Sequence, residues 1–425
     1  MRDHLGEGRT DGAGIRRRHV IYLSGYDPRG AQGYFSLFQR TCKRFEKFWP
    51  AVPVLEPIEI VSDDRAHWRL DLRGPNWQVT THYDFLRMED HIRAEMRGSP
   101  LSQLLRALAW YAGDVVSGAQ FSIFRASWRF ALHLLCFQLL GLIWAAVAMA
   151  IGIAAGYGLS ALLGMPTPAA GIAGLAAAIA AVFALRPLAV RWRLTQIASC
   201  WSTLRRFGRG RATWIDDVIE AGARRLVAVA AANDADEIAV VGHSTGGVTA
   251  SAIVMRALEL DPDLGRHGPR LVLLTLGSVM PAVALHPTAQ RMRAIVAKLA
   301  VARDVAWVDC QSRKDVMCFA NFDPVAGIGV DAGAERCNPL PWRITFRDMI
   351  APAEYGRFRR NFFRVHYQYI MAGDRPASYD YLLLVCGPMP IDQWPERNRE
   401  FAAMFLPDET SGNGARVRDV IAAAP

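Results

Sequence analysis

A long segment without charged side chains constrains the fold of this 425-residue chain more than any other feature. From Phe130 to Leu185, 56 consecutive residues include no Asp, Glu, Lys or Arg. A helix needs about 20 apolar residues to cross the hydrocarbon core of a bilayer, so the segment has room for two spans. The alternative is a buried soluble hairpin, but a chain of this length can hardly bury so many uncharged residues. We therefore predict a transmembrane hairpin.

The two spans are expected near 132–156 and 169–185, with a charge-free loop at 157–168 between them. Pro166 and Pro168 mark this loop. In the first span Gly152 and Gly156 form a G-x-x-x-G pattern, and small residues at this spacing let two helices approach closely in lipid.

Arginines flank the hairpin on both sides, whereas the loop between the spans carries no charge. Two precede the first span and seven follow the second: Arg125 and Arg129, then Arg186, Arg191, Arg193, Arg205, Arg206, Arg209 and Arg211. By the positive-inside rule, both flanks and the rest of the chain are expected in the cytoplasm. Trp128, Trp192 and Trp201 occupy positions typical of interfacial aromatic residues, although core packing explains them equally well.

The formal net charge of +9 does not indicate a nucleic-acid partner. Of the 49 basic residues only four are lysines, and the arginines are interspersed with acidic residues, a bias typical of a GC-rich bacterial genome. We therefore expect a bacterial inner-membrane protein.

The seven cysteines are widely spaced and form no C-x-x-C pair, which predicts reduced thiols. The first twenty residues lack an apolar core, so no secretory signal peptide is expected.

Outside the hairpin, apolar strands alternate with helices, which predicts an α/β fold with a mostly parallel sheet flanked by helices. Strands are expected at 19–24, 77–83, 237–241, 270–276 and 305–308, and helices at 101–124 (a candidate for the membrane surface), 212–232, 245–260 and 288–302. The predicted organisation is an N-terminal tail (1–17), an α/β domain in two parts (18–127 and 191–395), the hairpin (128–190) and a C-terminal tail (396–425).

The sequence Gly242-His243-Ser244-Thr245-Gly246 directly follows the strand at 237–241 and begins a helix. A serine between glycines at a strand-to-helix turn projects its hydroxyl from the end of the sheet, and side chains at either glycine would collide with neighbouring elements. A glycine-rich turn without chemistry is the alternative. With its valine-rich strand, the motif resembles the nucleophile elbow of the α/β-hydrolase superfamily, especially its lipases and esterases.

The resemblance covers roughly 18–127 and 212–390 and implies an α/β-hydrolase fold, with the hairpin inserted before the elbow. It implies that Ser244 is the nucleophile and that Gly242 and Gly246 are the elbow glycines. In this family the triad follows the order Ser, acid, His, and His366 is the one histidine after the strand at 305–308. His366 is therefore expected to act as the general base; a structural histidine is the alternative.

Three acids follow that strand, and we expect Asp315 to be the triad member ahead of Asp323 and Asp309. Asp315 lies in a loop similar to the acid loop of the family, whereas Asp323 precedes a proline and Asp309 ends the strand. The resemblance implies an oxyanion hole made by the backbone N–H groups of Thr245 and Tyr26. Around Tyr26 the chain departs from the His-Gly pattern common in the family, and a surface turn is the alternative there.

Neither a metal nor a cofactor is expected, because the sequence has no H-E-x-x-H, Walker or dinucleotide-binding pattern. The resemblance implies a membrane-anchored serine hydrolase that cleaves carboxylic esters of lipid or other membrane-associated substrates through an acyl-enzyme. Its partners would then be the bilayer and the ester. An acyltransferase with the same nucleophile and a non-catalytic membrane scaffold are the alternative functions.

Overall fold

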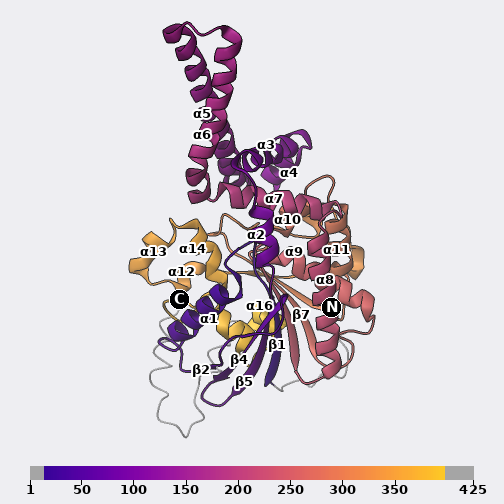
Figure 1. Cartoon of the computed structure of the whole chain (residues 1–425). Helices are drawn as coiled ribbons and strands as arrows, with labels where there is room; N and C mark the ends of the chain where they lie inside the picture. The colour runs from indigo at the N-terminus through magenta and orange to yellow at the C-terminus, as the bar shows by residue number, and fades with distance from the viewer. Residues whose placement is uncertain (1–13, 398–425) are drawn as a thin grey trace. The chain divides into compact units, whose positions relative to one another are not determined.

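A computed structural model of the chain describes residues 14–397, which fall into two compact units (Figure 1). The first unit consists of 14–90, 213–281 and 291–397, and the second of 91–212 and 282–290. Most of the predicted tails, at 1–13 and 398–425, lies outside the described residues. The segments on either side of the hairpin, which the sequence placed in the α/β domain, cluster with the hairpin in the second unit.

The first unit is built on a nine-stranded mixed sheet with the order β2-β4-β5-β1-β6-β7-β8-β9, and β3 also pairs with β4. Every pairing from β5 to β9 is parallel, whereas β4 is antiparallel to each of its neighbours. This confirms the predicted α/β class with a mostly parallel sheet. The strands are β1 (Arg17–Leu23), β2 (Val52–Leu55), β3 (Glu59–Ile60), β4 (Arg65–Arg73), β5 (Gln78–Leu86), β6 (Glu237–His243), β7 (Arg270–Leu276), β8 (Ala306–Gln311) and β9 (Leu340–Arg343).

Helices cover both faces of this sheet. Successive side chains of the central strands point to opposite faces, and they are buried on both. On one face Val20 of β1 and Val241 of β6 share a core with α1 (Gly30–Phe45) and α15 (Tyr381–Cys386). On the other face α8 (Thr213–Ala232) packs against α9 (Gly246–Leu260). The other helices of the first unit are α12 (Phe346–Met349), α13 (Pro352–Phe358), α14 (Phe362–Tyr367) and α16 (Trp394–Arg397). The helices α2 (Glu89–Met96), α10 (Met280–Ala284) and α11 (Gln290–Ala300) contain residues of both units.

The second unit contains the two long apolar helices α5 (Trp128–Leu163) and α6 (Thr167–Arg191). Each is long and apolar enough to cross a membrane, as the sequence predicted. The predicted loop at 157–168 is too long: residues 157–163 continue α5, and only 164–166 connect the helices. Pro168 lies in the first turn of α6, where a proline loses no helical hydrogen bond.

The close packing of α5 on α6 depends on the glycines of the predicted G-x-x-x-G pattern. A Cβ at Gly152 would lie 2.6 Å from the carbonyl oxygen of Gly174 and 2.7 Å from Cβ of Ala178. A Cβ at Gly156 would lie 3.1 Å from the carbonyl oxygen of Ala170. The two backbones therefore approach each other as closely as the sequence pattern indicated.

Three further helices lie at the foot of the hairpin in Figure 1: α3 (Pro100–Val116), α4 (Ala119–Ala126) and α7 (Leu194–Gly208). The sequence predicted one helix over 101–124, and this prediction is wrong in one respect. Gly118 adopts a φ of 73°, in the left-handed region, and separates α3 from α4. The helix α7 was not predicted.

Candidate active site

Ser244 lies in the turn between β6 and α9 with a φ of 59°. Left-handed backbone geometry is uncommon for a serine, and a strained strand-to-helix turn of this kind is what the sequence motif predicted. The turn places the half-buried serine at the carboxyl end of β6, while Thr245 forms the N-cap of α9. The sequence-predicted nucleophile is therefore held at the edge of the sheet, at the beginning of a helix.

Both glycines of the motif are required by close approach of the backbone. A Cβ at Gly242 would lie 2.5 Å from the carbonyl oxygen of Gly246 and 2.6 Å from Cα of Gly247. A Cβ at Gly246 would collide with the carbonyl oxygen of Leu23 in β1. Any side chain at either position would move backbone atoms, which explains the residue type at both positions.

His366 and Asp315, which are far apart in sequence, are hydrogen-bonded to each other. Nδ1 of His366, on α14, lies 2.7 Å from Oδ2 of Asp315, and both side chains are buried. The second carboxylate oxygen of Asp315 accepts a hydrogen bond of 2.8 Å from the backbone N–H of Met317. Because a carboxylate accepts through its oxygens, Nδ1 of His366 is the donor in this hydrogen bond.

The two other candidate acids are engaged elsewhere. Oδ1 of the buried Asp309 accepts a hydrogen bond of 2.6 Å from the Thr275 hydroxyl, and Oδ2 accepts one of 2.7 Å from Gln311. Asp323 forms a bidentate ion pair with Arg336, with both distances 2.8 Å. Neither acid is hydrogen-bonded to His366 among the described residues, so the geometry favours Asp315.

His243, which directly precedes the serine, connects the elbow to the helix that carries His366. Its Nε2 donates a hydrogen bond of 3.0 Å to the backbone carbonyl of His366, and the two imidazole rings are 4.8 Å apart. Burial holds the pKa of His243 well below its usual value, so this ring is neutral. His243 therefore has a structural role at this site.

Nε2 of His366 is buried and has no hydrogen-bond partner among residues 14–397. No hydrogen bond joins it to the Ser244 hydroxyl in this structure. Hydrogen bonds between catalytic groups are often long or poorly aligned without substrate. The left-handed turn at Ser244 and the His366–Asp315 pair are thus both present, without a hydrogen bond between them.

The loop after β1 faces the elbow. Strands β1 and β6 are parallel neighbours with Leu23 opposite Gly242, so their carboxyl ends lie side by side. A Cβ at Gly25 would lie 3.5 Å from Oγ of Ser244, so Gly25 leaves the space beside the hydroxyl open. After β1 the chain continues toward the β2 edge of the sheet, and after β6 it continues toward the β9 edge. Ligands of parallel sheets often bind at such a switch point. Tyr26 and Thr245, the predicted oxyanion donors, follow these two strands.

A buried carboxylate in the same loop was missed by the sequence analysis, which considered only an oxyanion loop or a surface turn there. The carboxylate of Asp27 accepts a hydrogen bond of 2.5 Å from the hydroxyl of Tyr367, the residue after His366. It also pairs with Arg29, whose guanidinium lies over the Tyr367 ring. In the sequence, the Asp-Pro dipeptide at 27–28 is typical of a turn. The contact between Asp27 and Tyr367 exists only in the folded chain.

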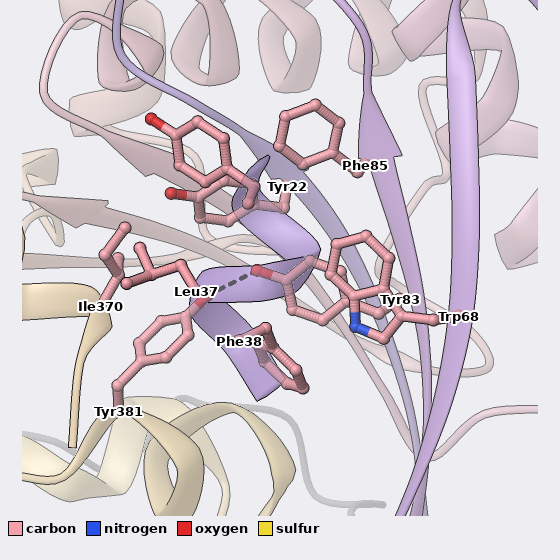
Figure 2. Close-up of a pocket in the computed structure, with 9 residues that line it drawn as sticks. Tyr22, Leu37, Phe38, Trp68, Tyr83, Phe85, Ile370 and Tyr381 are labelled. Atoms are coloured by element: carbon pink, nitrogen blue, oxygen red, sulfur yellow. Dashed lines mark hydrogen bonds between the residues drawn. The ribbon is translucent and has the colours of Figure 1, made fainter. Parts of the chain in front are cut away.

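A cavity near this loop is too small to hold a substrate. It has a volume of about 10 Å³, room for about one water molecule. Figure 2 shows its aromatic lining, including Tyr22, Trp68 and Phe85, and the hydrogen bond of 2.6 Å between the hydroxyls of Tyr83 and Tyr381. This cavity belongs to the core of the first unit.

Within 14–397, no group of three or more His, Cys, Asp and Glu side chains is arranged to hold a metal ion. Comparisons with protein-family models, with curated proteins and with solved structures find no match to this chain.

Proposed function

We propose that the chain is a membrane-anchored serine hydrolase of the α/β-hydrolase type, with Ser244, His366 and Asp315 as its triad. The observation that carries this proposal is the buried His366–Asp315 hydrogen bond of 2.7 Å, in a fold that also holds Ser244 in a left-handed turn after a parallel strand. A buried His–Asp pair and a serine in a strained strand-to-helix turn are two of the elements that a catalytic triad requires, which supports the proposal.

In the proposed reaction, Nε2 of His366 takes the proton of the Ser244 hydroxyl while Oγ attacks the carbonyl carbon of an ester. The C–O bond to the leaving alcohol then breaks, and the imidazolium returns the proton to that alcohol. Asp315 keeps the imidazole in the required tautomer and stabilises its charged form. Water, activated by the same histidine, attacks the acyl-enzyme and releases the carboxylic acid.

The negative charge on the carbonyl oxygen in the tetrahedral intermediate needs hydrogen-bond donors. The N–H of Thr245, at the N-terminus of α9, is one candidate, since the first amides of a helix have no acceptor within it. The N–H of Tyr26, in the loop facing the elbow, is the second. Two such donors are each worth on the order of 3 kcal/mol of transition-state stabilisation.

The hairpin supports a membrane-associated substrate, because it belongs to the same polypeptide and tethers the proposed site to a bilayer. The distribution of arginines supports insertion from the cytoplasmic side of a bacterial inner membrane. A lipid or another ester that partitions into the membrane is therefore the proposed substrate.

The test is hydrolysis of a series of p-nitrophenyl esters of increasing acyl length by the detergent-solubilised full chain and its Ser244→Ala variant. We expect turnover by the wild-type chain only, with a preference for acyl chains that partition into micelles. If the Ser244→Ala variant hydrolyses the esters as fast as the wild type, Ser244 is not the nucleophile.

A further inference from the structure

The exposed residues of helix α3 are almost all apolar, unlike those of a helix on the surface of a soluble protein, and its buried face contains polar residues beside Leu104, Ala107 and Trp110. Leu105 is 56% exposed and Val116 is 87% exposed, while Asp114 and Gln103 are buried. Apart from Ser102, all exposed residues of α3 are apolar: Leu101, Leu105, Ala109, Ala112, Val115 and Val116. Most of them are spaced by three or four residues and form one stripe along the helix.

The helix α4 continues this apolar surface. Phe121 is 65% exposed and Phe124 is 50% exposed, and Trp128 at the beginning of α5 is 58% exposed. The guanidinium of Arg125 lies 5.8 Å from the centre of the Phe121 ring. Aromatic residues beside arginines are typical of the boundary between lipid headgroups and acyl chains.

The contacts of α3 place it at one end of the hairpin. Asp114 accepts a hydrogen bond of 3.1 Å from Gln138 of α5, and Gln103 accepts one of 3.3 Å from Arg186 of α6. The 36 residues of α5 would extend about 54 Å, well beyond the hydrocarbon core of about 30 Å. The part of α5 beyond these contacts, 144–163, is long enough to cross the core. If 144–163 occupies the core, which shifts the first span from the expected 132–156, the contacts of α3 lie at the boundary of the core.

The charge around this end of the hairpin is of one sign. Between Asp114 and Asp216 the chain contains no acidic residue, whereas nine arginines flank the two spans. Basic residues next to a membrane-spanning segment are attracted to anionic lipid headgroups by about 1 kcal/mol each.

We propose that α3 and α4 form an interfacial platform, with the apolar stripe of α3 and the phenylalanines of α4 inserted at the headgroup boundary of an anionic phospholipid leaflet. This inference rests on the proposed membrane insertion of the hairpin and is independent of the proposed catalysis. The platform enlarges the membrane contact of the second unit beyond the two spans.

The test uses the full chain with its two exposed cysteines removed by Cys136→Ser and Cys337→Ser, and one new cysteine carrying an environment-sensitive fluorophore. The chain is reconstituted in phosphatidylglycerol–phosphatidylcholine vesicles that contain lipids with a quencher at a shallow or a deep acyl position. At Val116→Cys we expect blue-shifted emission and quenching by the shallow lipid. A label at Arg224→Cys, on the exposed side of α8, should emit as in water.

A third label at Ile151→Cys in α5 separates this inference from the hairpin itself. Strong deep quenching at Ile151 together with water-like emission at Val116 overturns the platform alone. Water-like emission at both positions overturns the membrane hairpin and the platform with it.

A second inference concerns the buried carboxylate of Asp27, whose partners come from both sides of the candidate site. It accepts hydrogen bonds from the hydroxyl of Tyr367 (2.5 Å) and from the backbone N–H of Arg29 (2.9 Å). The hydroxyl of Tyr34 approaches it at 3.4 Å. Asp27 adjoins Tyr26, and Tyr367 adjoins His366, so one hydrogen bond joins the loop of the oxyanion donor to the segment of the general base.

We infer that Asp27 and Tyr367 are positioning residues that fix the Tyr26 amide relative to His366. Misplacement of a catalytic group by about 1 Å can cost on the order of a hundredfold in rate, so a bond between these two segments affects catalysis without touching the substrate. This inference rests on the proposed hydrolase function.

The test compares Tyr367→Phe with Tyr34→Phe, which removes a hydroxyl at a longer distance from the same carboxylate. Active sites are first counted with a fluorophosphonate, so that misfolded protein does not affect the rates. We expect Tyr367→Phe to lower kcat for a p-nitrophenyl ester about tenfold or more with little change in KM. The affinity for an alkyl boronic acid, which forms a tetrahedral adduct with the serine, should fall in parallel. Tyr34→Phe should stay within about twofold of the wild type.

Unchanged kcat and boronate affinity in Tyr367→Phe, with an active wild-type chain, overturn the positioning role. A wild-type chain that neither hydrolyses the ester nor reacts with the fluorophosphonate overturns the proposed function instead. The two failures are therefore distinguishable.

Discussion

Nδ1 of His366 and Oδ2 of Asp315 are 2.7 Å apart, although the two residues are 51 positions apart in the sequence. A strand end, a loop and a short helix bring the two side chains together in a buried environment. Burial strengthens such a hydrogen bond and excludes water that would compete for the imidazole.

The Asp315→Asn variant should lower kcat for ester hydrolysis on the order of a thousandfold or more, because an amide can hold the imidazole in the wrong tautomer. Asp309→Asn and Asp323→Asn are the matched controls and should cost less than about tenfold, since their carboxylates bond other partners. The measurement is kcat per titrated active site. A larger loss in either control than in Asp315→Asn would assign the acid differently.

Ser244→Ala and His366→Ala should each remove nearly all turnover, and the double variant should be little slower than either single variant. Triad residues act as a unit, so losing one member leaves only the rate that the rest of the site supports. Steady-state rates of the three variants, measured on one ester, test this. Multiplicative losses in the double variant would show that the two residues act independently.

The Gly152→Leu variant should disrupt the packing of α5 on α6, because even a Cβ at this position meets the backbone of Gly174. We expect a cost of about 1–3 kcal/mol, seen as a lower Tm in detergent. Gly158→Leu on the same helix is the control, because a Cβ there has no atom within 4 Å. Equal Tm values for the two variants would contradict the packing seen in the hairpin.

The orientation of the hairpin predicts different labelling at its two ends. A cysteine at Met165, in the three-residue connection, should react with a membrane-impermeant maleimide in intact cells. A cysteine at Arg224 should react only after the membrane is opened, since moving each flanking arginine through a bilayer core costs about 2.5–3.5 kcal/mol. Both variants need serine at Cys136 and Cys337. The reverse pattern would invert the predicted topology.

The parallel part of the sheet and the hairpin were predictable because each has a strong local pattern. The strand before Ser244 is a continuous apolar run, and the hairpin is a long segment without charge. The antiparallel strand β4 was missed although its buried residues Ala66, Trp68, Leu70 and Leu72 alternate, because charged residues between them hide the apolar run. The break at Gly118 was missed because the apolar pattern continues across it.

The site was only partly predictable for a different reason. The elbow is a local motif, so its glycines can be read directly from the sequence. The Asp27–Tyr367 hydrogen bond joins residues 340 positions apart, and neither residue belongs to a motif. The sequence ranked Asp315 first among three candidate acids, and the hydrogen bond to His366 that favours this ranking exists only in the folded chain.

The central claim is that Ser244 is an activated nucleophile, and its most direct test is covalent labelling by a fluorophosphonate. The full chain in detergent is treated with the probe, digested, and analysed by mass spectrometry for the modified peptide. We predict one phosphonylated residue, Ser244, and no labelling in Ser244→Ala or His366→Ala. An unlabelled wild-type chain, or a label that persists at another residue in Ser244→Ala, would contradict the account.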